Sequence, residues 1–327
     1  MSPHTDLTRR GLLRSAAAAG AASAVFGGAA WASEQPAATA GVPQVKPEEI
    51  GLDPRRLQAA YDLLAKWTAG PNAPVPGGAI LAGRFGKAVT PRFFGRQGPE
   101  PDAEPIRRDS MFYMASVTKP VIYTAGMLLV ERGLLNLNDP VTRYIPEFTG
   151  QGKDDVQVLH LFTHTCGLPD ELPNNTELRR QPQFGWNSQY WQEFGSPAGG
   201  LFSTPEDYAV LCDMMLNGGR RGDVQLLSPA SVRQMTTNRL DDLPDLPEPV
   251  RRTQPWGLGW RLNHLGTPDS WSDLLSRKVF GHTGSAGNVV WMDPETQGFC
   301  LIFTNYLRAR APWRLVHLSN AVASAFV

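Results

Sequence analysis

The amino-acid sequence predicts an α+β protein, in which one antiparallel sheet is built from both ends of the chain. Three observations lead to this prediction. Strand-like runs occupy residues 77–98, a second set occupies residues 255–307, and well-capped helical segments lie between the two sets. Because strands and helices form blocks and do not alternate, a parallel sheet of βαβ units is not expected.

The first helix is predicted to begin after Asp53. Asp53 is a favourable N-cap residue, Pro54 fits the first helical position, and apolar residues recur on one stripe as far as Trp67. The segment that follows, "GGAILAGRFGKAVTPRFFGRQG", is typical of two strands joined near Gly86. The sequence therefore predicts a helix followed by a hairpin.

Three more helices have clear start signals. The first is expected from Ser116 to Gly133, with Pro120 in its first turn, where the missing N–H costs little. The other two are expected after Thr204 and after Ser228, each an N-cap residue followed directly by proline. These helices separate the two sets of strands.

The C-terminal part is strand-rich. The segments "PWGLGWRL", "RKVFGHTG", "NVVWMDP" and "FCLIFTNYL" carry β-branched and aromatic residues, and "GNVVWMDPETQGFCLIFTN" is a strong hairpin signal. A final helix is expected from about Pro312. Together with residues 77–98, these strands complete the predicted sheet.

Composition and charge exclude several classes of function. The chain has 31 Lys+Arg and 31 Asp+Glu residues, so nothing attracts it to nucleic acid or to an anionic membrane. Its 3 cysteines match no metal or redox spacing, and one disulfide between two of them is left open. His160 and His164 lack the glutamate of a zinc-protease motif, so capping and packing are the expected roles. These residues therefore predict no metal site.

The first 32 residues are typical of an export signal. Arg9 and Arg10 precede an Ala-rich apolar stretch, and Ala30 and Ala32 form a small-residue cleavage site. The stretch is short and weakly apolar, which argues against a membrane anchor. We therefore expect a twin-arginine signal peptide at 1–32, a periplasmic or secreted location, a linker at 33–47 and one domain at 48–327.

Ser116 and Lys119 form a Ser-x-x-Lys motif, which by itself is weak evidence because it also arises by chance. Its context strengthens it. Ser116 stands where a helix begins, and Lys119 lies three residues on, on the same helix face. A serine hydroxyl becomes a good nucleophile when a neighbour takes its proton, and a desolvated lysine can do so. The small residues of "GHTGSAG", after a strand, suit close approach to a substrate and an oxyanion-binding N–H.

At these residues the chain resembles the serine β-lactamases and penicillin-binding proteins, in particular the branch of class C-like β-lactamases, esterases and D-alanyl peptidases. The matching stretches, in the family's order from about Glu48 to about Leu307, are "FYMASVTKP", "LLNLNDPVTRYIPEF", "HLFTHTCGL", "AGGLFSTPEDYA", "LSPASVRQM", "WGLGW" and "GHTGSAG". Taken together they are far more specific than Ser-x-x-Lys alone.

The resemblance implies an acyl-enzyme hydrolase without metal or cofactor. Ser116 would be acylated and Lys119 would help to activate it. His282, Thr283 and Gly284 would take the place of the family's Lys-Thr-Gly motif. The backbone N–H groups of Ser116 and Ser285 would form the oxyanion hole.

Two departures from the family pattern stand out. His282 replaces a lysine, and a neutral imidazole binds an anion less well. The helical lobe is shortened around residues 169–198, and the Tyr-x-Asn motif expected there is missing. Tyr190 is the only local substitute for its tyrosine, and the surrounding "WNSQYW" is typical of packing; Tyr144 is also expected to pack.

The sequence thus predicts an exported hydrolase of small esters, amides or D-amino-acid peptides, in preference to a true β-lactamase. The alternative is a catalytically impaired remnant that folds and binds a ligand. The lost tyrosine motivates it, because a general acid–base group is worth about 10²–10⁴-fold in rate. A deleted helical block would also expose apolar surface, which predicts reduced stability or a homodimer.

Overall fold

The computed structural model describes residues 41–70, 72–168, 181, 183, 185, 188–263 and 271–327. The expected signal peptide at 1–32 and the linker up to residue 40 lie outside the described residues. Among the described residues, no helix has the length and apolar character needed to cross a membrane.

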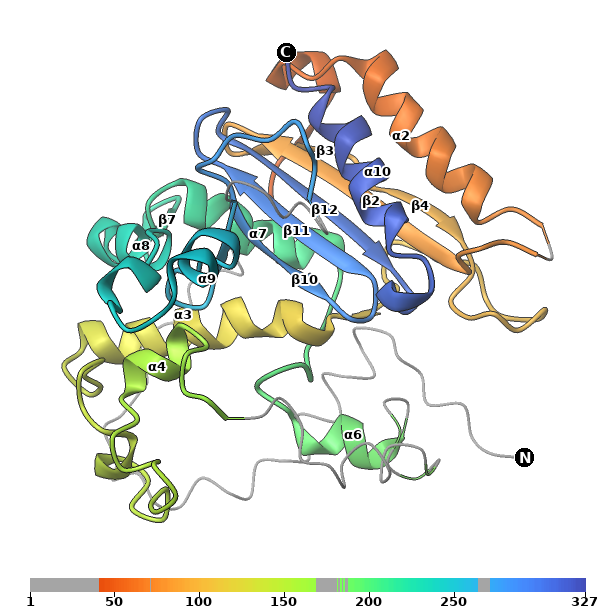
Figure 1. Cartoon of the computed structure of the whole chain (residues 1–327). Helices are drawn as coiled ribbons and strands as arrows, with labels where there is room; N and C mark the ends of the chain where they lie inside the picture. Colours follow the sequence, from red (N-terminus) through yellow and green to blue (C-terminus); the bar gives the residue numbers. More distant parts are fainter. Residues whose placement is uncertain are drawn as a thin grey trace.

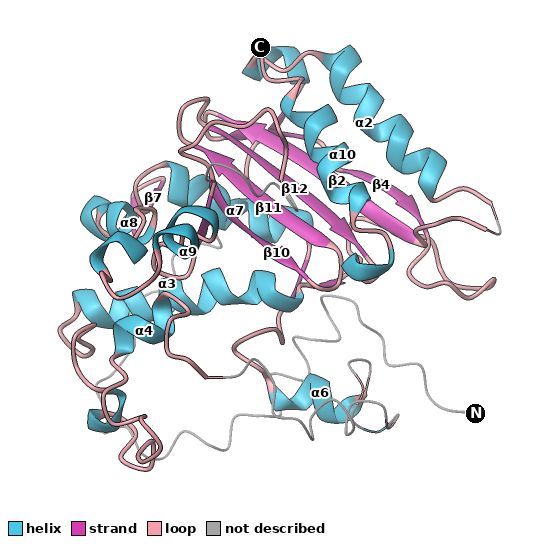
Figure 2. Ribbon diagram, in the orientation of Figure 1, coloured by secondary structure: helices cyan, strands magenta, loops and turns pink. Residues whose placement is uncertain are grey.

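A central sheet of eight strands organises the molecule (Figures 1 and 2). Its order is β1-β3-β2-β12-β11-β10-β9, with β4 also paired to β2. All pairs are antiparallel except β1 with β3. The strands are β1 (Gln44–Val45), β2 (Gly77–Arg84), β3 (Lys87–Val89), β4 (Arg92–Gly95), β9 (Arg261–Leu262), β10 (Phe280–Gly284), β11 (Asn288–Asp293) and β12 (Gly298–Thr304). Two small antiparallel sheets of two strands each lie outside it: β5 (Phe112–Tyr113) with β6 (Phe202–Ser203), and the hairpin of β7 (Arg220–Arg221) with β8 (Val224–Gln225).

The two ends of the chain meet where β2 pairs with β12, from Gly298 opposite Arg84 to Thr304 opposite Gly78. The predicted α+β class, with a sheet built from both chain ends, is confirmed. The long C-terminal strand expected over "PWGLGWRL" is wrong, because only its last two residues form β9.

The prediction of two strands in residues 77–98 is incomplete, since the segment forms three. The turn at Phe85 and Gly86, both with positive φ, joins β2 to β3 as a two-residue hairpin loop. The chain then turns back, and β4 pairs with Gly77–Ile80 at the other end of β2. Strand β2 is long enough to hold a different partner along each half of the same edge.

Three helices begin at the expected caps, whereas the helix expected from Ser116 begins at Thr118, after a 3-10 turn that contains Ser116. Side chains of Asp53, Thr204 and Ser228 accept hydrogen bonds from N–H groups in the first turns of their helices. The helices are α2 (Pro54–Trp67), α3 (Thr118–Glu131), α4 (Val158–Phe162), α6 (Gln189–Phe194), α7 (Pro205–Leu216), α8 (Pro229–Met235), α9 (Glu248–Thr253) and α10 (Trp313–Ala323). Short 3-10 helices are η1 (Pro47–Ile50), η2 (Ala115–Val117), η3 (Val141–Arg143), η5 (Leu240–Asp242) and η6 (Arg308–Arg310).

Helices α2 and α10 cover one face of the sheet (Figure 1). Leu64 from α2 and Leu318 from α10 are fully buried in one cluster with Ile80 and Ile302 of the sheet. Each such side chain contributes roughly 1.5–3 kcal/mol when it is withdrawn from water. This layer joins the N-terminal and C-terminal parts of the chain.

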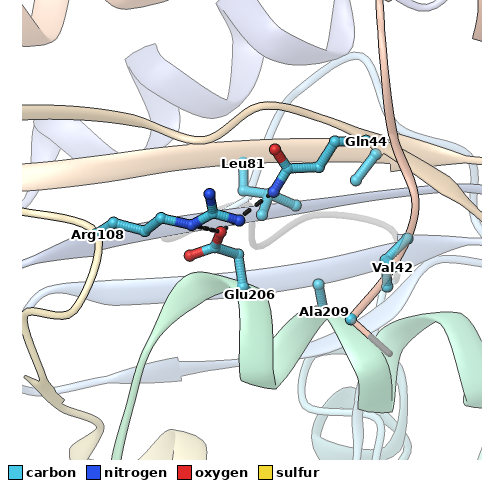
Figure 3. A pocket seen from close by; sticks show the side chains of 8 residues that line it. Val42, Gln44, Leu81, Arg108, Glu206 and Ala209 are labelled. Carbon is cyan, nitrogen blue, oxygen red and sulfur yellow. Dashed lines mark hydrogen bonds and ion pairs between the residues drawn. The ribbon is translucent and has the colours of Figure 1, made fainter. Parts of the chain in front are cut away.

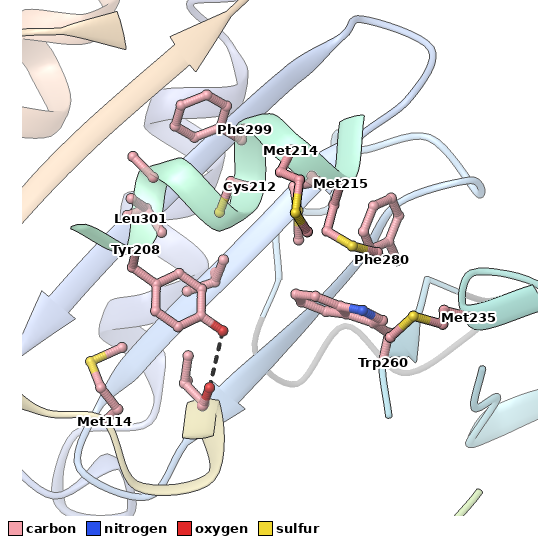
Figure 4. Packing of buried hydrophobic residues seen from close by; sticks show 14 of the residues in the cluster. Met114, Tyr208, Cys212, Met214, Met215, Met235, Trp260, Phe280, Phe299 and Leu301 are labelled. Atoms are coloured by element: carbon pink, nitrogen blue, oxygen red, sulfur yellow. Dashed lines mark hydrogen bonds between the residues drawn. The ribbon is translucent and has the colours of Figure 1, made fainter. Parts of the chain in front are cut away.

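Helix α7 packs against the opposite face, where Tyr208 and Cys212 lie over Phe299 and Leu301 (Figure 4). The buried Tyr208 hydroxyl donates a hydrogen bond of 3.0 Å to the Val117 carbonyl. The core therefore extends directly to the segment that carries Ser116.

No disulfide forms: all three cysteines are free thiols. Cys212 and Cys300 are fully buried, and burial raises the pKa of both thiols. They act as small core residues.

The two histidines of "HLFTH" have the capping and packing roles that were expected. His160 Nδ1 accepts a hydrogen bond of 3.1 Å from the Gln157 N–H at the start of α4. The His164 ring packs on Trp256, with 4.1 Å between ring centroids. Tyr144 closes a loop by hydrogen bonds, donating to Asp139 (2.6 Å) and accepting from the Asn136 N–H (2.9 Å), so its role is not packing alone.

Candidate active site

Ser116 and Lys119 lie together at the start of α3. Ser116 belongs to the 3-10 turn η2, and Lys119 is the second residue of α3. Lys119 Nζ lies 3.0 Å from Ser116 Oγ and donates a second hydrogen bond of 3.0 Å to the Ala198 carbonyl. Both side chains are half-buried. A lysine nitrogen is thus held at hydrogen-bond distance from a partly accessible serine hydroxyl.

The residues around Ser116 are fixed from several sides. The Met114 N–H donates to the Leu201 carbonyl (2.8 Å), and the Leu201 N–H donates to Thr118 Oγ1 (3.0 Å). Ala115 has a φ of 46°, in the left-handed region that costs a non-glycine residue about 1–2 kcal/mol. The anchoring at Leu201 and at Tyr208 holds this strained turn in place.

The strand motif faces the Ser116 segment across a close contact. His282, Thr283 and Gly284 end β10. A Cβ on Gly284 would lie 2.5 Å from the Met114 carbonyl oxygen, so only glycine fits at this distance. The structure therefore brings the residues predicted from the C-terminal motif against the residues predicted from the N-terminal one.

The two backbone N–H groups expected to bind an oxyanion are placed on the two sides of this contact. Ser116 is the second residue of a 3-10 helix, a position whose N–H has no partner within the helix. Ser285 follows β10 directly, and its carbonyl accepts a hydrogen bond of 2.8 Å from the Arg308 N–H.

His282 is a buried neutral side chain. It is 4% exposed. Its Nδ1–H donates a hydrogen bond of 2.8 Å to the Thr283 carbonyl, so the lone pair of the neutral ring lies on Nε2. Burial, with a smaller contribution from the nearby Lys119 charge, holds the pKa of His282 well below its usual value. The ring therefore does not supply the positive charge of the lysine that it replaces.

Helix α6 docks beside the Ser116 segment through Trp191, whose Nε1 donates a hydrogen bond of 3.1 Å to the Tyr113 hydroxyl. Of the segment "WNSQYW", Trp191 makes this contact, whereas Trp186 and Asn187 lie outside the described residues. Tyr190 is 49% exposed and its ring stacks on Phe194, with 5.9 Å between ring centroids. Within the shortened segment, residues 169–180, 182, 184, 186 and 187 lie outside the described residues.

Three neighbours of the site were missed by sequence reasoning: Ala198, Tyr208 and Asn288. The first two lie inside the motif "AGGLFSTPEDYA", which marked the segment without revealing its contacts. Asn288 carried no sequence signal, yet it is fully buried and donates a hydrogen bond of 2.8 Å to the Tyr113 carbonyl.

A hollow of about 190 Å³ lies elsewhere, between the sheet and α7 (Figure 3). Its polar groups bind one another. Glu206 forms an ion pair with Arg108 at 2.5 Å and accepts a hydrogen bond of 3.1 Å from Gln44 Nε2. None of the site residues predicted from the sequence lines it. The hollow offers no activated nucleophile.

Comparison with known proteins places these features in a family. The family model described as "Beta-lactamase" matches residues 64–183 and 173–322. A "Beta-lactamase" of Yersinia enterocolitica is 37% identical over 125 residues, which are 38% of this chain and 31% of that protein. "Esterase EstB" of Burkholderia gladioli is 38% identical over 126 residues, 37% of this chain and 32% of that protein. The matches thus span about a third of each relative.

A solved structure supports the fold independently. A penicillin-binding protein homolog from Caulobacter crescentus aligns with a TM-score of 0.66 at 18% identity, covering 84% of this chain and 99% of that one. At this identity the likeness concerns the fold alone. Since the family model matches most of the chain, and since its two matched ranges contain both Ser116 and the strand motif, the chain belongs to the beta-lactamase family.

Proposed function

We propose that the protein is a serine hydrolase in which Ser116 is acylated and Lys119 accepts its proton. The observation that carries the proposal is the distance of 3.0 Å between Lys119 Nζ and Ser116 Oγ at the start of α3. The Ala198 carbonyl orients the amine from its other side.

The reaction would proceed in two steps. Ser116 Oγ attacks the substrate carbonyl while its proton moves to a neutral Lys119 amine, and the Lys119 ammonium then gives that proton to the alcohol or amine that leaves. In the second step water attacks the acyl carbon and passes a proton to Lys119, which returns it to Ser116 Oγ as the acyl–Oγ bond breaks and the acid is released. The N–H groups of Ser116 and Ser285 would hold the developing oxyanion, because backbone donors set in advance stabilise that charge without reorganising.

The proposed substrates are small neutral esters, or D-amino-acid peptides, in preference to β-lactams. The neutral, buried His282 supports the neutral esters, because a substrate that carries a carboxylate, whether a β-lactam or a peptide with a free C-terminus, would find no cation at that position. Comparing turnover of p-nitrophenyl butyrate with that of nitrocefin tests it. Hydrolysis of nitrocefin alone would refute the preference.

We also propose export to the periplasm or medium through the twin-arginine pair Arg9 and Arg10, with cleavage after Ala32. Replacing both arginines by lysine is expected to retain the uncleaved protein in the cell. Continued export of the variant would contradict the proposal.

The test of catalysis is intact-protein mass spectrometry after exposure to a fluorophosphonate. We expect one adduct on the wild type and on Ser324→Ala, a control serine near the C-terminus, and none on Ser116→Ala. Lys119→Met should slow adduct formation by about 10²–10⁴-fold, as expected for loss of a proton acceptor. A folded wild-type sample that forms no adduct would refute the proposal.

The second candidate is a ligand-binding remnant, favoured by the missing Tyr-x-Asn motif. It predicts that penicillin raises the melting temperature without forming an adduct. It also predicts a homodimer in gel filtration, because the shortened lobe would leave apolar surface uncovered. A monomer that reacts at Ser116 would exclude this candidate.

A further inference from the structure

Asn288, the first residue of β11, connects two segments that are distant in the sequence. Its side chain is fully buried. Its Nδ2 donates a hydrogen bond of 2.8 Å to the carbonyl of Tyr113, three residues before Ser116. Its Oδ1 accepts one of 3.0 Å from the Thr304 N–H at the end of β12. One amide thus links the Ser116 segment to the central strands.

The turn between Gly284 and Asn288 is fixed from the other side by a buried network. Thr304 Oγ1 donates a hydrogen bond of 2.6 Å to the Gly287 carbonyl. The fully buried Arg314 donates to the same Thr304 oxygen, from Nε at 3.2 Å and from Nη2 at 3.1 Å. Burial lowers the pKa of Arg314 to about 10, so the guanidinium stays charged at neutral pH.

The turn accepts only glycine at Gly287. The φ of this residue is 95°, and a Cβ at this position would lie 1.9 Å from Arg314 Nη2. The carbonyl of Ser285 is held as well, by the Arg308 N–H. The turn is therefore held by hydrogen bonds at Ser285 and Gly287, and Asn288 joins it to the Ser116 segment.

We propose that Asn288 is a positioning residue that sets the separation between the N–H groups of Ser116 and Ser285. The inference rests on the proposed function, in which these two groups bind the oxyanion. Catalysis by such donors is sensitive to their placement: losing one costs about 10²–10³-fold in kcat, and a misplacement of about 1 Å can cost about 10²-fold. Asn288 acts on the reaction only through these two segments.

If Asn288 had only a structural role, its replacement would lower the stability of the protein without a specific effect on the reaction rate. Asn305 provides the matched control. Its Oδ1 accepts a hydrogen bond of 2.9 Å from the Gly77 N–H, and its Nδ2 donates one of 2.7 Å to the Arg96 carbonyl. It makes the same two kinds of bond as Asn288, but it connects β2 to the end of β4.

The experiment compares Asn288→Ala, Asn288→Asp and Asn305→Ala in the full-length protein. The Asp variant keeps the acceptor for Thr304, and it replaces the donor to Tyr113 by a carboxylate oxygen that faces the Tyr113 carbonyl at a buried position. We expect both Asn288 variants to lower kcat and the rate of fluorophosphonate labelling by about 10- to 100-fold, with KM little changed. Asn305→Ala should lower the melting temperature and keep the wild-type labelling rate. Equal labelling rates in the Asn288 variants and the Asn305 variant would overturn the proposal.

Hydrogen exchange provides a readout that does not depend on activity. Peptides covering residues 112–117 and 284–287 should exchange faster in Asn288→Ala than in the wild type. In Asn305→Ala the exchange rates of the same peptides should equal those of the wild type. A wild type that forms no adduct would refute the proposed function, while exchange would still decide whether Asn288 couples the two segments. Unchanged exchange in Asn288→Ala would overturn the proposal on its own.

Discussion

Gly284→Ala is expected to damage the active site while leaving the sheet intact. The new methyl carbon would lie 2.5 Å from the Met114 carbonyl oxygen and 3.4 Å from Ala115 Cβ and Val117 Cγ2. An ordinary contact begins near 3.4 Å, so β10 and the Ser116 segment must separate by about 0.9 Å. A displacement of about 1 Å between catalytic groups can cost about 10²-fold in rate, and we expect a loss of that size in kcat.

The assay is the rate of fluorophosphonate labelling at Ser116, followed by mass spectrometry, beside a thermal melt of the same sample. Gly199→Ala is the matched control. Gly199 also faces the Ser116 segment, but its Cβ would meet the Ala115 carbonyl carbon and the Tyr113 hydroxyl at 3.5 Å, an ordinary contact. The control should label at the wild-type rate. A folded Gly284→Ala protein that also labels at the wild-type rate would refute the steric reasoning.

Three further predictions concern stability. His282 has a lowered pKa in the folded protein. Below the ordinary pKa of about 6.5, the unfolded chain therefore binds a proton that the native state does not. The free energy of unfolding decreases as the pH is lowered through this range. Chemical denaturation at pH 7.5 and 5 should show a smaller loss for His282→Gln than for the wild type, and the exposed His317→Gln should behave like the wild type. Thr204→Ala removes the bond to the Asp207 N–H that caps α7 and should cost about 1 kcal/mol in urea unfolding; a normal midpoint would contradict the capping role. Arg221→Met leaves the buried Asp213 carboxylate without its cation at 2.8 Å and should cost about 3 kcal/mol by the same assay, whereas an unchanged midpoint would show that the pair adds nothing.

Much of the fold could be predicted because its signals are local. The caps at Asp53, Thr204 and Ser228 act on N–H groups two or three residues away, and those helices begin where expected. Strand β4 and the short β9 were predicted less well. Their pairing depends on how much of a neighbouring strand edge is left free, which the composition of a segment does not reveal.

The same distinction holds for the candidate site. The spacing of Ser116 and Lys119 brings their side chains together on one helical turn, and the structure places their reactive atoms 3.0 Å apart. The sequence indicated that His282 replaces a lysine, but its burial and the preferred tautomer depend on the residues packed around β10.

The sequence by itself determined the class of fold through the order of its strand and helix blocks, and it determined the capped helices and the Ser116–Lys119 pair because these depend on residues a few positions apart. Only the tertiary structure decided what surrounds that pair. Ala198 meets Lys119 across 79 positions, and Asn288 meets Tyr113 across 175. Contacts at such separations form only after distant parts of the chain have packed into one core, and no local pattern encodes which atoms then meet.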